Sequence, residues 1–392
     1  MKNIGVFLGH PCHFHNMKNV VENLKRDGYN VFIAIKEKDM LEQLCIDAGY
    51  EYYKLREGRG NSKLAMVKSV LGMEHRMMKF IRKNKIELLV GSTLSFAAAK
   101  LARIPVLVMC EDDADAVPHY ANIVYPFATL ILSPECCDNS RWKKKSVYYP
   151  SYHELAYLHP NHFTPDASIV ERYGIDVKRP YFIVRFSALN AHHDMGIHGI
   201  NTQIAERMIE MLEPHGRIYI TSERPLEPQF EQYRIKINPL DMHHVMAFAS
   251  LYVGDSQTMA AEAGVLGTPF VRFNDFVGRL SYLHELEAPS DMNPRGDGYV
   301  PKIDAHVPDD VHYSLGYGHK TADVEGFFAS IERWLAMPDR KAVCVERREK
   351  MLSEKVDYAK FLTYFIEQYP ASAMETKKAN RESNTEFWQQ FK

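Results

Sequence analysis

The segment Leu251–Phe273, LYVGDSQTMAAEAGVLGTPFVRF, decides the fold of this chain. It predicts a short apolar strand over Leu251–Val253, a tight polar turn, a helix, and a second strand after Thr268 and Pro269. A helix that connects two strands in this way is the repeating unit of a parallel α/β sheet. We therefore expect α/β architecture here, and the rest of the chain shows whether the unit repeats.

The turn in this segment carries residue types that suit a nucleotide. Ser256, Gln257 and Thr258 stand at the start of the helix, where unpaired backbone N–H groups and the helix dipole attract an anion. Glu262 lies four residues after Thr258, so both side chains share one helix face. A diphosphate at the helix start would leave Glu262 near the ribose hydroxyls. The alternative is a crossover helix that Asp255 or Ser256 merely caps.

Composition limits the class of protein. With 392 residues the chain is long enough for two domains, and its net charge of −2 lacks the basic excess typical of nucleic-acid binding. The six cysteines form no C-x-x-C pair and no metal-ligand spacing, which indicates reduced thiols. The sequence starts directly with a strand pattern, and no apolar run approaches the roughly 20 residues of a membrane span. We expect a cytoplasmic protein that binds no nucleic acid; no oligomeric state follows.

Strand patterns alternate with helical patterns along most of the chain and predict two successive doubly wound domains. Predicted strands are Ile4–Leu8, Val31–Ile35, Glu51–Leu55, Leu88–Val90, Val106–Met109, Leu130–Leu132, Phe182–Arg185, Ile218–Thr221, Ile235–Ile237, Tyr252-Val253 and Phe270–Phe273. The expected domains are a Rossmann-like N-terminal domain over 1–160 and a Rossmann-like C-terminal domain over 161–345. Helices over 346–370 return to the first domain, 288–312 is a Pro- and Gly-rich loop, and 371–392 is a disordered tail.

Three histidines, His10, His13 and His15, lie between the first predicted strand and its helix. Ligands of open parallel sheets bind beyond the carboxyl ends of the strands, so this loop should face the binding edge. A histidine there suits general-base work because its ordinary pKa is near 6.5. A zinc site and simple helix capping are the alternatives, although no carboxylate or thiolate pattern supports zinc.

Further polar groups follow other predicted strands. Arg185 and His193 belong to the loop after the first strand of the second half, where they could contact phosphate; an internal Arg–Asp pair is the alternative. The run Glu111-Asp112-Asp113 could bind Mg²⁺ or substrate hydroxyls, or form a solvated turn. The basic run over 141–145, RWKKK, could touch an anionic membrane surface or form a solvated loop.

Over about residues 1–369 the chain resembles a prokaryotic group named domain of unknown function 354, which is similar to GT-B glycosyltransferases and UDP-N-acetylglucosamine 2-epimerases. The matching segments are GHPCHFHNMKNVVENLKRDGYNV (9–31), YPSYHELAYLHP (149–160), RFSALNAHHD (185–194) and GDSQTMAAEAGVLGTP (254–269). The resemblance implies a GT-B-like fold of two doubly wound Rossmann-type domains facing across a cleft. It also implies that the second domain holds a nucleotide sugar.

The resemblance implies roles for particular residues. The spacing from His13 to Gly28 matches the histidine loop of the related transferase that extends a lipid-linked peptidoglycan precursor. His13 is therefore the implied base, with His10 and His15 as neighbours. The resemblance also implies Ser256, Gln257 and Thr258 at phosphate and Glu262 at ribose. Of the epimerase Val-Glu-Ala-Gly segment, only Glu111 is retained, as a catalytic candidate.

Two departures from the epimerase pattern favour glycosyl transfer over epimerisation. One is the Val-Glu-Ala-Gly segment, which keeps only its glutamate here, and the other is a turn. Epimerases carry a catalytic aspartate in a Gly-Asp-Thr turn, whereas this chain has Gly91-Ser92-Thr93. The 288–312 loop also looks like an insertion relative to the group. We expect a UDP-sugar glycosyltransferase of cell-surface polysaccharide or glycolipid synthesis. Its acceptor is unidentified, with lipid-linked molecules among the candidates, and it needs no metal cofactor. Peripheral membrane contact is compatible with this expectation. The alternatives are an epimerase or hydrolase of the same substrate, or a non-catalytic binding protein.

Overall fold

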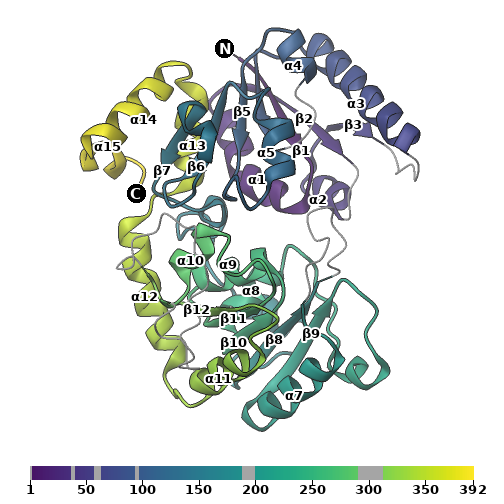
Figure 1. Ribbon diagram of the computed structural model, residues 1–392, viewed down its shortest axis with the longest axis vertical. Coiled ribbons are helices and arrows are strands. Elements are labelled where there is room, and N and C mark those ends of the chain that lie inside the picture. Colours follow the sequence, from purple (N-terminus) through teal and green to yellow (C-terminus); the bar gives the residue numbers. More distant parts are fainter. Residues whose placement is uncertain (1, 37–39, 57–62, 93–96, 188–198, 290–311) are drawn as a thin grey trace. The chain divides into compact units, whose positions relative to one another are not determined.

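The computed structural model describes residues 2–36, 40–56, 63–92, 97–187, 199–289 and 312–392, and the chain divides into two units (Figure 1). Unit 1 joins Met1–His162 to Lys355–Lys392, and unit 2 is Phe163–Glu354. The first boundary falls at 162/163, close to the expected 160/161. The second falls at 354/355 instead of 345/346, because α12 (Arg340–Glu354) packs against α9 (Gln257–Val265) within unit 2.

A parallel sheet in the order β3-β2-β1-β4-β5-β6-β7 forms the centre of unit 1 in its described part. The strands are β1 (Asn3–Leu8), β2 (Asn30–Lys36), β3 (Tyr52–Arg56), β4 (Leu88–Gly91), β5 (Val106–Met109), β6 (Leu130–Pro134) and β7 (Ser146–Tyr149). The direction of strand addition reverses between β1 and β4, so right-handed crossovers place helices on both faces. Covered on both sides, β1, β4 and β5 are almost completely buried.

Helices of unit 1 bury the faces that their apolar spacing predicts. In α1 (Pro11–Arg26) the buried set includes Met17, Val20, Val21 and Leu24, and Gly28 ends the helix region with a φ of 86°, which glycine adopts without strain. Both α13 (Tyr358–Glu367) and α2 (Leu41–Asp47) pack against α1. The helices α3 (Lys63–Lys83), α4 (Ala97–Leu101) and α5 (Pro118–Val124) lie together on the other face (Figure 1).

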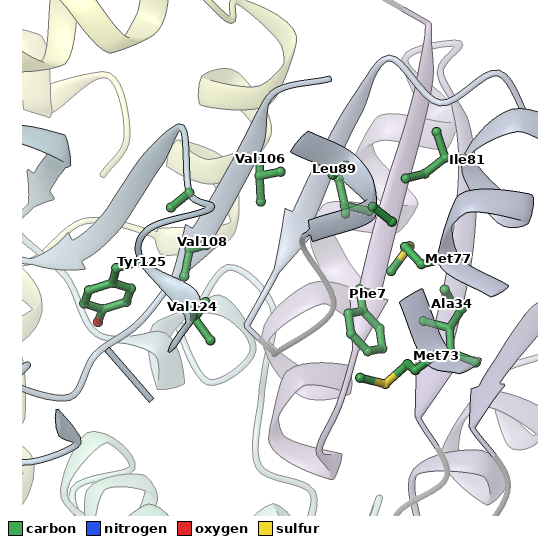
Figure 2. Close-up of a cluster of buried hydrophobic side chains, with 14 of the residues drawn as sticks. Phe7, Ala34, Met73, Met77, Ile81, Leu89, Val106, Val108, Val124 and Tyr125 are labelled. Carbon is green, nitrogen blue, oxygen red and sulfur yellow. The ribbon is translucent and has the colours of Figure 1, made fainter. Parts of the chain in front are cut away.

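The hydrophobic core of unit 1 joins α3 to the sheet. Met73, Met77 and Ile81 recur every four residues along α3, and they share one buried cluster with Phe7 of β1 and Leu89 of β4 (Figure 2). The same cluster continues to β5 and α5 through Val106, Val108, Val124 and Tyr125. This packing holds the carboxyl ends of β1, β4 and β5 in fixed positions.

A second parallel sheet, ordered β12-β11-β10-β8-β9, forms the described part of unit 2, and its direction of strand addition reverses between β8 and β10. The strands are β8 (Tyr181–Phe186), β9 (Arg217–Ser222), β10 (Leu251–Gly254), β11 (Phe270–Phe273) and β12 (Gly316–His319). The helices, besides α9 and α12, are α6 (Ala167–Glu171), α7 (Thr202–Leu212), α8 (Met242–Phe248), α10 (Ser281–Leu286) and α11 (Val324–Leu335).

Three buried polar side chains fasten β12 to α11. His319 Nδ1 lies 2.8 Å from Asp323 Oδ2, and His319 Nε2 lies 2.8 Å from Ser330 Oγ. The other Asp323 oxygen caps α11 by accepting from the Gly326 amide at 2.9 Å. His319 and Asp323 are each 5% exposed and Ser330 is 0% exposed, so the group is closed to solvent.

One predicted strand is absent from the described part of the structure, and two strands in that part were not predicted. Ile235–Ile237 is not a strand; only an isolated bridge joins Arg234 to Ile220 of β9. The edge strands β7 and β12 were not predicted from the sequence. In β12 a Cβ at Gly316 would lie 2.4 Å from the Phe270 ring, so this position requires glycine. A strand that contains such glycines lacks the apolar pattern by which strands are predicted. The predicted loop over 288–312 lies largely outside the described residues.

The prediction of a disordered tail over 371–392 is wrong. This stretch forms α14 (Ala371–Glu382), which packs on β7, and α15 (Thr385–Gln389). Phe391 is 2% exposed, and its ring lies 5.4 Å from that of Phe361 and 5.1 Å from that of Tyr364 on α13. The average composition of the tail is polar, but a few spaced aromatic residues suffice to anchor it.

Candidate functional site

The reversal between β8 and β10 creates the binding edge of unit 2, because ligands of open α/β sheets bind at this point. Gly254 ends β10 beside Arg185 of β8. A Cβ at Gly254 would lie 2.5 Å from the Tyr252 hydroxyl and 2.9 Å from Arg185 Cβ. Glycine therefore allows the two strand ends to approach closely where the chain turns into α9.

Ser256 caps the N-terminus of α9, which settles the choice between Asp255 and Ser256. Its hydroxyl accepts a hydrogen bond from the Met259 amide at 3.4 Å. Ser256, Gln257 and Thr258 are all half-buried, at the positive end of a nine-residue helix. This geometry can hold an anion at the carboxyl edge of β10.

Asp255 instead organises the loop that follows β8. Its buried carboxylate accepts from the Ser187 amide at 2.7 Å and from the Ile200 amide at 3.3 Å, so it holds both ends of the segment between them. Its carbonyl accepts from Asn274 Nδ2 at 2.9 Å. Burial raises the pKa of Asp255 to about 6, although the two amide hydrogen bonds oppose this rise. His193, a predicted phosphate ligand, lies in the interior of this segment, outside the described residues.

Two arginines lie close to this turn. Arg185 is hydrogen-bonded to the Glu223 carboxylate and has 18% of its side chain exposed. The guanidinium of Arg224 stacks 5.1 Å from the Phe186 ring and donates to the Ile200 carbonyl, which also places it near the Asp255 loop. Arg185 was predicted from the sequence. Arg224 was not, since it follows a different strand.

Glu262 is buried and paired with a residue that the sequence did not single out. Its Oε1 lies 2.9 Å from Nε2 of His243, in the first turn of α8. Glu262 is 6% exposed and His243 5%. His243 is the second residue of α8, and Glu262 is the sixth of the nine residues of α9. Nothing in the sequence relates these two residues, which are 19 positions apart.

In unit 1 the polar candidates follow three adjacent strands, β1, β4 and β5. The histidine loop follows β1, Ser92 follows β4, and Glu111 follows β5. A Cβ at Gly91 would lie 2.5 Å from the Phe7 carbonyl oxygen, so only glycine fits between β1 and β4. The Ser92 hydroxyl donates to the Met109 carbonyl of β5.

The backbone sets the tautomer of His13. The Gly9 amide donates to His13 Nδ1 at 3.1 Å, so Nδ1 must present a lone pair. The neutral ring therefore carries its proton on Nε2 and is a hydrogen-bond donor there. A base role at Nε2 requires the other tautomer, which forfeits the Gly9 hydrogen bond, worth about 1 kcal/mol.

The other two histidines of the loop have structural partners. His10 is the N-cap of α1; its Nδ1 accepts from the Cys12 amide at 3.4 Å and lies 3.1 Å from Cys12 Sγ. The His10 and His13 rings are 6.1 Å apart, so His10 remains a neighbour of His13. His15 is only 8% exposed and its ring lies 5.3 Å from that of Tyr157, inside the unit.

Glu111 is held by a histidine from the 149–160 segment. Its Oε2 accepts from the His153 amide at 3.3 Å and lies 3.4 Å from His153 Nδ1. Next to it, burial and the neighbouring Glu111 and Asp113 carboxylates raise the pKa of Asp112 to about 7. Two adjacent carboxyl groups in unlike environments are typical of acid–base sites.

Asp112→Asn is expected to stabilise the protein by a margin that grows as pH rises from about 4 to 7. The folded-state pKa of about 7 exceeds the roughly 3.9 of an unfolded aspartate, so folding favours the protonated carboxyl. The wild type consequently loses up to about 4 kcal/mol over this interval relative to the variant. Calorimetry of both proteins at pH 5 and pH 8 should show the wider Tm gap at pH 8. Equal gaps would contradict the raised pKa.

Several charged residues of the acidic and basic runs serve the fold. Asp113 Oδ1 accepts from the Asp138 amide at 2.8 Å. Lys145 Nζ donates to three carbonyls, those of Tyr125, Pro126 and Ala128. Within the described ranges, no three His, Cys, Asp or Glu side chains are grouped so as to hold a metal ion. Over the same ranges no helix is both long and apolar enough to cross a membrane.

Solved structures similar to this chain include both epimerases and glycosyltransferases. One is a protein assigned as a UDP-N-acetylglucosamine 2-epimerase from Listeria monocytogenes, with 12% identity, 94% of this chain and 97% of that chain covered, and a TM-score of 0.63. MnaA of S. aureus, solved with UDP, has 14% identity, the same coverage and a TM-score of 0.60. The spinosyn rhamnosyltransferase SpnG, solved with thymidine diphosphate, has 14% identity, 93% and 100% coverage, and a TM-score of 0.58.

The chain has the GT-B fold. Each of these matches extends over nearly the whole of both chains, and the two parallel-sheet units correspond to the two Rossmann-type domains that the sequence predicts. No protein-family profile and no curated protein sequence matches the chain. At identities of 12–14% the likeness establishes the fold, so activity must be argued from the residues of the site.

Proposed function

We propose that this protein is a glycosyltransferase that takes its sugar from a nucleoside diphosphate donor, UDP-linked, bound by unit 2. One observation carries the proposal. Helix α9 starts at Ser256–Thr258, where the helix N-terminus would attract an anion, and one turn further it carries the buried carboxylate of Glu262. Thr258 and Glu262 are about 6 Å apart along the helix axis, which suits a diphosphate followed by a ribose.

On the donor side, the helix N-terminus and Arg185 would hold the diphosphate and stabilise the charge that builds up as it leaves. His193 would add a phosphate contact, and Glu262 would accept from the ribose hydroxyls. Such an arrangement neutralises the leaving group without a divalent ion. The similar structures solved with UDP and with thymidine diphosphate support a nucleotide in this fold.

On the acceptor side, His13 would take the proton of the attacking hydroxyl, with His10 and Glu111 shaping the same edge of unit 1. The tautomer preference does not prevent this role. Giving up the Gly9 hydrogen bond costs about 1 kcal/mol. A positioned base contributes roughly 10²–10⁴-fold, or about 3–5 kcal/mol. The stabilisation of the transition state by the base therefore exceeds the cost of losing the Gly9 hydrogen bond.

The environment of Ser92 favours transfer over epimerisation. It stands where the resemblance to epimerases would require a carboxylate, and its hydroxyl is engaged by the Met109 carbonyl of the next strand. A group that is small, uncharged and bound to the backbone does not supply acid–base chemistry on a sugar ring. The acceptor that we propose is a lipid-linked or polysaccharide hydroxyl.

Incubation of the protein with UDP-sugars, with and without lipid-linked or polysaccharide fragments, tests this proposal. Release of UDP that depends on the acceptor is expected, at a rate unchanged by EDTA. Isomerisation of the sugar without acceptor would establish the epimerase instead. Loss of activity on chelation, restored by Mg²⁺ or Mn²⁺, would show that a metal neutralises the diphosphate. If no nucleotide raises the melting temperature at millimolar concentration, the donor site is wrongly assigned.

A further inference from the structure

The buried pair of Glu262 and His243 has a geometry that points to selection of the sugar part of a nucleotide. Nε2 of the imidazole lies 2.9 Å from Oε1 of the carboxylate. A carboxylate cannot donate, so the ring donates its Nε2–H to this oxygen. The hydrogen bond orients one oxygen of the group, and a carboxylate can accept about four hydrogen bonds in all, those from ligand hydroxyls included.

His243 is itself held in place by neighbouring elements. The Phe163 ring meets it edge to face, with ring centres 6.2 Å apart, and lies 4.7 Å from the adjacent ring of His244. His244 Nδ1 accepts from the Asp166 amide at 3.0 Å. The first residues of unit 2 thus pack against the start of α8, and this packing limits the positions that the His243 ring can take.

We propose that His243 is a positioning residue which, by holding Glu262 as an oriented hydrogen-bond acceptor, makes unit 2 select ribonucleotides over 2′-deoxyribonucleotides. The inference rests on the proposed nucleotide site of the same unit. A ribose presents two adjacent hydroxyl donors to a carboxylate. A 2′-deoxyribose lacks one of them and leaves a desolvated carboxylate oxygen without that donor. The expected preference for the ribonucleotide is about 10- to 100-fold in Kd.

A merely structural role would give a different result. If His243 only stabilised the fold of α8 and α9, its removal would weaken both nucleotides equally or neither. If it orients Glu262, its removal should weaken the ribonucleotide and leave the deoxyribonucleotide unchanged. The ratio of the two dissociation constants therefore separates the two roles.

The experiment is calorimetric titration of UDP and 2′-deoxy-UDP into the full-length wild type, His243→Gln, His243→Asn and Glu262→Gln. The Gln amide can place an N–H near the position of Nε2, whereas the shorter Asn amide cannot reach it. We expect wild type and His243→Gln to prefer UDP. We expect His243→Asn and Glu262→Gln to bind both nucleotides with nearly the same Kd, close to that of wild type for 2′-deoxy-UDP.

Each other outcome overturns a specific part of the inference. A wild type that binds both nucleotides equally shows that Glu262 does not contact the 2′-hydroxyl. Undiminished preference in His243→Asn shows that Glu262 needs no orienting histidine. A wild type that binds neither nucleotide overturns the proposed function together with this inference. A folded His243→Gln that loses the preference also contradicts the donor role of Nε2.

Discussion

His13→Ala is expected to lower kcat by about 10²–10⁴-fold while leaving the affinity for UDP nearly unchanged. The imidazole stands in the loop after β1, where the Gly9 amide donates to Nδ1; once the ring gives up this hydrogen bond and carries its proton on Nδ1, Nε2 can accept a proton. Because the proposed nucleotide-binding residues belong to unit 2, deletion of a group in unit 1 should affect the chemical step and spare binding. Steady-state rates with saturating donor and titration of UDP measure the two effects separately.

Two further variants distinguish a base from a hydrogen-bond donor. In His13→Asn the side-chain oxygen can still accept from the Gly9 amide, but nothing replaces Nε2. In His13→Gln an amide N–H replaces the Nε2–H donor and cannot act as a base. Both variants should be as slow as His13→Ala if His13 removes a proton. Retention of more than about a tenth of the wild-type rate by His13→Gln would instead mean that His13 only donates a hydrogen bond.

Phe391→Ala is expected to destabilise unit 1 by about 3–5 kcal/mol, the usual cost of removing a buried aromatic ring. The ring packs on Phe361 and Tyr364, and the carbonyl of Phe391 accepts from the Asp357 amide at 2.9 Å at the start of α13. Differential scanning calorimetry should show a lower melting temperature for the transition of unit 1. The transition of unit 2 should remain where it is, since the two units need not unfold together.

Met374→Ala is the matched control for this experiment. Met374 belongs to the same C-terminal stretch, on α14, and is also a large apolar residue, but it is 71% exposed. Its truncation should change the stability by less than about 0.5 kcal/mol. Equal melting temperatures for Phe391→Ala and the wild type would contradict the packing of the tail. That result would favour a disordered tail, as the polar composition of residues 371–392 predicts.

The fold was predictable from the sequence wherever local pattern and tertiary environment agree. The segment Leu251–Phe273 folds as its apolar runs and turn residues indicate, and α1 buries the side chains that its helical spacing selects. Prediction failed where a few long-range contacts outweigh composition. The tail is polar on average, yet Phe391 secures it, and β12 contains two glycines because Phe270 and Glu287 occupy the space of their Cβ atoms.

In the candidate site, too, features formed by consecutive residues could be predicted from the sequence, whereas contacts between distant residues could not. Ser256 and the helix start could be recognised because a cap and its helix are consecutive in the sequence. The partners of the Glu262 and Glu111 carboxylates could not be recognised in this way. His243 meets Glu262 across 19 positions and His153 meets Glu111 across 42, and both contacts exist only because neighbouring elements pack together. His153 lies in the segment 149–160, and nothing in that segment relates it to Glu111 before the chain is folded.

The fastening of β12 to α11 reproduces the order of groups in a serine hydrolase: Ser330 Oγ against His319 Nε2, and His319 Nδ1 against the Asp323 carboxylate. A catalytic triad is recognised by that geometry, and a search by geometry alone would assign peptidase or esterase chemistry to this domain. Here the serine has no exposed surface, so no carbonyl carbon can approach its oxygen and no active-site serine reagent should label it. The serine of such a triad acts as a nucleophile only where a substrate can reach it. In this protein the same three groups are buried, and they hold β12 against α11.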